Sequence, residues 1–112
     1  MLFRSRYAET GRWADAAAAL EAAIRVDPRD PRLHDNLGFV LQAQGRLAEA
    51  AAAYEAATRA WPPLAQPRIR LAALLVDRGE RDRARALLDE AARLEIDPDA
   101  ARAIEELRQR LN

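Results

Sequence analysis

Residue types recur along this chain at an interval of 34 residues, the step that separates Gly11, Gly45 and Gly79. Alanines and large residues keep the same step, each in a phase of its own: Ala16, Ala50 and Ala84; Ala23, Ala57 and Ala91; Leu20, Tyr54 and Leu88; Tyr7, Leu41 and Leu75. Because small, large and turn-forming residues hold separate phases, an abundance of alanine alone cannot produce the pattern. Such a period indicates structural units that stack in a row.

The middle copy of the repeat places residues without bulk inside long helix-forming stretches. A glycine inside a helix costs about 1 kcal/mol relative to alanine, so we interpret Gly38 as a point where another helix comes close. Ala50 and Ala57 also have little side chain, and Tyr54 fills the space beside them. Gly45 is predicted to end a helix, because glycine readily adopts the left-handed conformation that follows many helices.

Residues 31–64 resemble the tetratricopeptide repeat, a pair of antiparallel helices. The residues that match its pattern are Leu37, Gly38, Leu41, Gly45, Ala50, Tyr54, Ala57 and Pro62. His34 departs from the pattern, since the family prefers a large apolar residue there. The resemblance covers nearly the whole chain. It implies an all-α fold, a right-handed α-solenoid of antiparallel helix pairs with about seven helices.

The repeat divides the chain, as a single domain, into an incomplete first repeat at 1–30, a second repeat at 31–64, a third at 65–97 and a capping helix at 98–112. The helices are expected at 2–10, 13–26, 31–44, 47–60, 67–78, 81–94 and 98–111. Asp30 and Asp97 are predicted N-caps, with Pro31 and Pro98 in the first turn of the helices that follow.

The two ends of the chain depart from the middle copy. Arg4 takes the phase of Gly38, where a small residue is needed. Three explanations stay open: a chain that starts late or comes from a longer array, a face that receives a helix from another protomer, or an ordinary short first helix. At the other end, Ile104, Leu107 and Leu111 keep the phase of core residues, which predicts a helix that covers the last repeat.

Charge and composition argue against several classes of function. The chain has 18 basic and 18 acidic residues, all the basic ones are arginine, and the two signs are interleaved. This balance disfavours nucleic-acid and membrane-surface binding. The absence of cysteine excludes disulfides and thiolate metal sites. No stretch resembles a signal peptide or a membrane-spanning helix, so we predict a cytoplasmic protein.

The sequence offers no constellation suited to catalysis, so we expect a non-enzymatic protein without metal or cofactor. The single histidine, His34, stands at a position that normally faces the core between helices, which predicts a structural role. Residues 77–90 are rich in charge, which at helical spacing predicts an exposed face with ion pairs. Trp13 and Trp61 are expected to pack between adjacent repeats.

The first helix of each stacked pair is expected to line a concave groove, and the resemblance implies that this groove holds a peptide or helix of a partner protein. The groove-facing positions by phase are Ser5, Ala8, Glu9, Arg32, Asp35, Asn36, Phe39, Gln42, Gln66, Ile69, Arg70, Ala73, Val76 and Asp77. Phe39, Ile69 and Val76 predict an apolar centre, unless the terminal segment of the chain or a symmetry mate covers it. One subtype of the family binds C-terminal carboxylates through five polar residues. Asn36 and Arg70 match two of them, too few to predict that ligand.

The leading hypothesis is therefore a protein-interaction module that binds a partner in its groove. The alternative is a structural scaffold that oligomerises through its incomplete first repeat. RNA binding is a weaker third hypothesis, because the net charge is zero.

Overall fold

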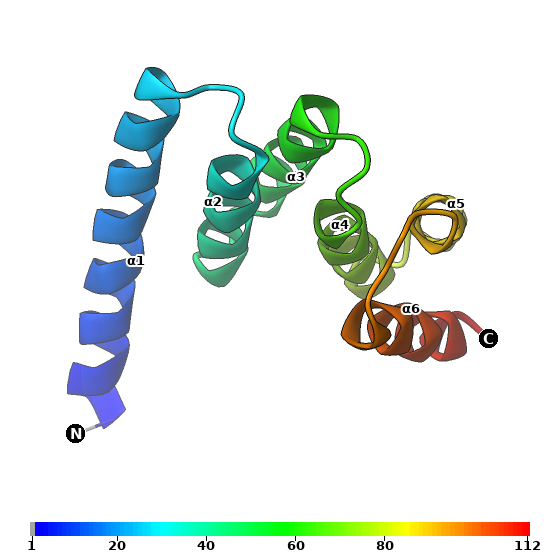
Figure 1. The fold of residues 1–112 in the computed structure, drawn as a ribbon. Helices are drawn as coiled ribbons and strands as arrows, with labels where there is room; N and C mark the ends of the chain where they lie inside the picture. Colours follow the sequence, from blue (N-terminus) through cyan, green and yellow to red (C-terminus); the bar gives the residue numbers. More distant parts are fainter. Residues whose placement is uncertain (1) are drawn as a thin grey trace.

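The computed structural model describes residues 2–112, and the side chains of residues 11–112. This part of the chain forms six helices and no strand. The helices are α1 (Leu2–Val26), α2 (Pro31–Ala43), α3 (Leu47–Ala60), α4 (Gln66–Asp77), α5 (Arg81–Ala92) and α6 (Pro98–Leu111). Figure 1 shows them following one another across the molecule, with α1 at one side and α5 and α6 at the other. From α2 onward, the helices begin and end within two residues of the predicted bounds.

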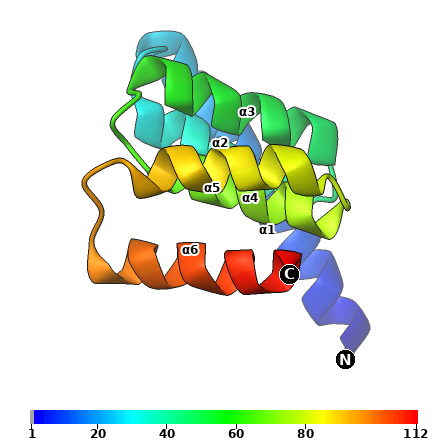
Figure 2. The ribbon, with the colours of Figure 1, turned by 90° about the vertical axis from the view of Figure 1, so that its right-hand side faces the viewer.

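Two antiparallel pairs, α2 with α3 and α4 with α5, form the centre of the stack. Neighbouring pairs meet through α3 and α4, and α6 packs against both α4 and α5. Figure 2 shows α6 running alongside the α4–α5 pair. The arrangement confirms the predicted all-helical solenoid. None of the helices in residues 2–112 is long and apolar enough to cross a membrane.

The start of α2 and the start of α6 follow the predicted cap chemistry. Asp30 accepts a hydrogen bond from the backbone N–H of Arg32 at 3.0 Å, and Asp97 accepts one from the N–H of Ala100 at 2.7 Å. Each proline after these caps occupies a position where a missing N–H leaves no helical hydrogen bond unmade.

Two of the three periodic glycines make the turns between paired helices. Gly45 and Gly79 have φ angles of +77° and +78°. In both turns, the next residue donates a backbone hydrogen bond to the helix just ended: Arg46 N–H to the Leu41 carbonyl and Glu80 N–H to the Leu75 carbonyl, each at 2.9 Å. This is the hydrogen-bond pattern of a glycine-ended helix.

Gly11 behaves differently, and here the prediction of two helices at 2–10 and 13–26 was wrong. Gly11 lies inside α1, which continues unbroken through it. A glycine turn leads to a stable hairpin only when the two helices can pack closely afterwards. Arg4 stands in the phase of Gly38, so the first repeat lacks the small residue that makes this contact possible. Continuing the helix keeps its backbone hydrogen bonds at the cost of about 1 kcal/mol for the glycine.

The core lies between the paired helices, at the positions identified by the repeat. Ala50, Tyr54, Ala84 and Leu88 are fully buried. Gly38 lies against the face of Tyr54: a Cβ added at residue 38 would stand 2.5 Å from the Tyr54 Cε1 atom. The predicted close contact between α2 and α3 is therefore confirmed.

The last helix, α6, covers the third repeat as predicted. Ile104, Leu107 and Leu111 are buried. Polar contacts add to this packing: Arg85 of α5 donates to the carbonyl oxygen of Leu111 at 2.8 Å, and Arg108 pairs with Asp89 of α5 at 3.0 Å.

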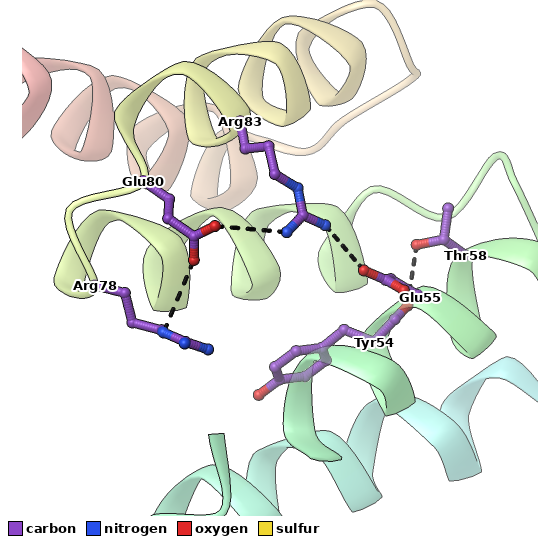
Figure 3. Close-up of polar contacts among 6 residues, drawn as sticks. All are labelled: Tyr54, Glu55, Thr58, Arg78, Glu80 and Arg83. Atoms are coloured by element: carbon purple, nitrogen blue, oxygen red, sulfur yellow. Dashed lines mark hydrogen bonds and ion pairs between the residues drawn. The ribbon is translucent and has the colours of Figure 1, made fainter. Parts of the chain in front are cut away.

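The charged segment 77–90 forms the exposed ion-pair face that its spacing predicts. Figure 3 shows Arg83 of α5 between Glu80 and Glu55. The Arg83–Glu55 pair, at 3.0 Å, joins α5 to α3 of the preceding pair, and Arg78 lies 3.8 Å from Glu80. These side chains are exposed, so each pair adds less than about 1 kcal/mol to stability.

Candidate functional site

The predicted groove positions on α2 and α4, which we call the groove face, differ widely in exposure. Those that are exposed are Arg32, Asn36, Phe39, Gln66 and Asp77, and those that are partly buried are Gln42, Arg70, Ala73 and Val76. Asp35 and Ile69 are buried, at 5% and 8% exposure. The predicted positions Ser5, Ala8 and Glu9 lie on α1, and their side chains fall outside those that the structure describes.

Phe39 is the main apolar side chain that the groove face presents to solvent, with 49% of its surface exposed. The expected apolar centre is therefore smaller than predicted. Ile69 belongs to the buried core, and Val76 packs against that core. The helix phase placed both on the groove side, but it could not show how far the neighbouring helices cover them.

Two residues from other helices hold the Phe39 ring in place. Trp13 of α1 meets it edge to face, with ring centroids 6.0 Å apart. Arg70 of α4 lies over the ring, with its Cζ atom 5.3 Å from the centroid. Trp13 thus packs between repeats, as predicted, but sequence reasoning did not assign it to the site. Trp61 is 57% exposed, so the prediction that it also packs between repeats was wrong.

Asp35 and Arg70 link α2 to α4 through an ion pair of 3.0 Å between Oδ2 and Nη1. Burial raises the pKa of Asp35, and the positive charge of Arg70 partly offsets this effect. The second carboxylate oxygen, Oδ1, is buried and accepts no hydrogen bond from the described residues. Asp35 therefore acts as the buried anchor of Arg70 and offers no free carboxylate to a ligand.

Gln42 is held in a similar way from below the groove face. The hydroxyl of Tyr54 donates to Gln42 Oε1 at 2.8 Å. Burial raises the pKa of Tyr54 to about 12, so the hydroxyl keeps its proton at neutral pH. The fully buried core residue of α3 thereby orients a side chain of the groove face.

Two other predicted residues have structural partners. His34 Nε2 lies 2.7 Å from the carbonyl oxygen of Pro28, which can only accept, so His34 donates and ties α2 to the loop before it. Asp77 pairs with Arg110 of α6 at 2.6 Å. Among the described residues, no three histidine, aspartate or glutamate side chains are grouped to hold a metal ion.

A cleft of about 470 Å³ adjoins the groove face between the beginnings of α4 and α6. Gln66, Ile69 and Arg70 contribute to it from the groove face. The other lining residues are Leu64, Ala65, Glu95, Ile96, Asp97, Asp99, Ala100 and Ala103. Sequence reasoning missed the contribution of α6 and of the loop before it, because it treated α6 as a cap. The available signal was the delay of two residues between the phase of Pro28 and Pro62, which Ile96 occupies, and Pro98.

Comparison with solved structures finds the same fold in proteins of low sequence identity. The TPR2B domain of yeast Sti1, solved as a complex with pHsp70, superposes with a TM-score of 0.83 at 24% identity, over 96% of this chain and 88% of that one. The Yersinia enterocolitica type III secretion chaperone SycD, in complex with a peptide of the translocator YopD, gives 0.80 at 23% identity, over 98% and 84%. SycD without that peptide in its description gives 0.78 at 24% identity, over 97% and 78%.

Sequence comparison gives the family directly. No curated protein sequence matches the chain. The family model of the tetratricopeptide repeat matches residues 5–65, more than half of the chain. Together with the helix pairs described above, this match shows that the chain belongs to the tetratricopeptide repeat family.

Proposed function

We propose that this protein is a non-enzymatic interaction module that binds a peptide or a helix of a partner protein along its groove face. The observation that carries the proposal is Phe39, a large apolar side chain that is half exposed and yet fixed from two sides by Trp13 and Arg70. A rigid, exposed aromatic ring loses little conformational entropy when a partner covers it, which is typical of binding hot spots.

The surroundings of Phe39 support the same reading. Arg32, Asn36 and Gln66 are exposed polar residues on the same two helices, so an apolar contact has a polar rim. The TPR2B domain and SycD, which share the fold, were each solved with a bound partner. The proposal includes a cytoplasmic location and the absence of a cofactor, both of which rest on the sequence alone.

The test begins with peptides selected for binding to this protein from a random display library. Substituting Phe39→Ala should weaken the selected peptides by about tenfold to a hundredfold, the effect of losing a hot-spot side chain. Titration calorimetry measures the affinity. Trp61→Ala is the matched control, since it removes another exposed aromatic ring away from the groove face. Equal affinity of the Phe39→Ala variant and the parent would show that the peptides bind elsewhere.

A second candidate function is self-assembly through the first repeat. Ala50, Tyr54 and Ala57 of α3, and the equivalent residues of α5, are all fully buried. The positions in the same phase on α1 are Ala16, Leu20 and Ala23, and they are only partly buried. A helix from another protomer could cover this face of α1.

Light scattering after size-exclusion chromatography tests self-assembly. If the face of α1 is an interface, the protein should be a dimer or larger, and Leu20→Glu should convert it to a monomer that retains its helicity. A parent protein that stays monomeric at the highest soluble concentration would rule out this candidate.

A further inference from the structure

We propose that the cleft between α4 and α6 receives a basic side chain, a lysine or an arginine, of the partner segment that lies along the groove face. This inference rests on the proposed groove function and specifies the partner. The cleft shares Gln66, Ile69 and Arg70 with the groove face, so a segment bound over Phe39 and Arg70 continues into it. Its volume of about 470 Å³ leaves room for a long side chain and the backbone that carries it.

The apolar part of the lining suits the stem of such a side chain. Leu64, Ile69 and Ile96 line the cleft together with three alanines, Ala65, Ala100 and Ala103. Lysine and arginine carry three or four methylene groups that pack on apolar surface while the charged end stays near water. A short polar side chain would leave this surface uncovered.

The charged part of the lining selects the sign of the occupant. Glu95, Asp97 and Asp99 lie close together in sequence and all line the cleft. Asp97 uses one oxygen to cap α6, and Asp99 lies 3.8 Å from Arg102 at a largely exposed site. Glu95 forms no ion pair within residues 11–112. These carboxylates favour a cation and repel an acidic side chain.

Arg70, the basic residue of the lining, does not cancel this preference. Its guanidinium is paired with the buried Asp35 at 3.0 Å and lies over the ring of Phe39. Its positive charge is therefore already compensated within the groove face. The three carboxylates of the rim remain in excess, so the end of the groove next to α6 is acidic.

The experiment compares two short probes that differ in charge alone. They are acetyl-Leu-Arg-Leu-amide and the same peptide with citrulline, a neutral analogue of nearly the same shape as arginine. Each is titrated into the ¹⁵N-labelled protein, and the amide signals of Ile69, Ile96 and Ala103 report on the cleft. The arginine peptide should bind about threefold to tenfold more tightly, the effect of one or two solvent-exposed ion pairs. High salt should reduce the difference.

A double variant tests which carboxylates are responsible. In Glu95→Gln/Asp99→Asn the preference for arginine should disappear, while the affinity for the citrulline peptide stays as it was. Asp97 is left unchanged because it caps α6. The matched control is Glu105→Gln/Glu106→Gln, which removes the same charge from exposed positions farther along α6 and should keep the preference.

Three results would overturn the inference: equal affinity for the two peptides, a preference that survives in the double variant, or cleft signals that do not move with the arginine peptide. Lysine and acetyl-lysine peptides repeat the comparison for the other basic residue. Failure of the groove proposal looks different, because it appears as selected peptides that bind the Phe39→Ala variant as tightly as the parent.

Discussion

At the scale of single residues, the contact between Gly38 and Tyr54 joins the fold to the groove face. Tyr54 can lie flat against α2 because residue 38 has no side chain. In that position its hydroxyl reaches Gln42 on the groove face. A buried ring thus fixes the distance between two helices and orients an outer side chain at the same time.

A bulky residue at position 38 should destabilise the protein severely. We expect Gly38→Leu to lower the free energy of unfolding by about 3 kcal/mol, because overpacking forces the Tyr54 ring or the whole of α3 to move. Chemical denaturation monitored by circular dichroism measures the change. A variant as stable as the parent would contradict the close approach of α2 and α3.

The stability of the fold should also depend on the ionisation of Tyr54. Its pKa is raised from 10.0 to about 12 in the folded protein, so the folded state favours the neutral phenol. This contribution is fully present below pH 10 and is lost as the pH rises toward 12. We expect roughly 1–2 kcal/mol to be lost in this window. In the Tyr54→Phe variant, the pH dependence between these values should be correspondingly weaker in denaturation experiments.

At the scale of helices, the same residue type does opposite work at equivalent positions of the repeat. Gly45 lets the chain turn back after α2, whereas Gly11 lies inside α1. The sequence around each glycine is similar, so the difference arises from what the preceding helix can pack against. Residue 38 is a glycine, and residue 4, in the same phase, is an arginine.

Alanine substitutions at these two glycines should therefore change stability in opposite directions. Gly11→Ala should raise the free energy of unfolding by about 0.5–1 kcal/mol, because alanine favours the helix and a Cβ there meets no atom within 4 Å. Gly45→Ala should lower it by about 1–2 kcal/mol, because φ is +77° at this position. If Gly11→Ala destabilised the protein instead, the first repeat would contain a turn at Gly11 in solution.

At the scale of the whole molecule, the repeat predicted the features that depend on local phase. The helix pairs, both glycine turns and the buried positions Ala50, Tyr54 and Leu88 follow directly from it. Features that depend on neighbouring units did not follow. The burial of Ile69 and the cleft beside it depend on where α6 lies, and the late position of Pro98 shifts that helix by an amount that only the packed structure reveals.

Stacking also predicts that one substitution has different costs in different repeats. Leu20 and Leu88 occupy the same phase, but Leu88 is fully buried by its neighbours whereas Leu20 is only partly buried. In the described residues, α5 contacts α4 and α6, and α1 contacts α2 alone.

We therefore expect Leu88→Ala to cost about 3–4 kcal/mol and Leu20→Ala about 1 kcal/mol, because the cavity left behind is enclosed only in the third repeat. Chemical denaturation of the two variants at one protein concentration gives the comparison. Equal and large losses would contradict this expectation. They would mean that the face of α1 is covered in solution as completely as that of α5, and a dependence of the Leu20→Ala loss on protein concentration would identify a second protomer as the cover.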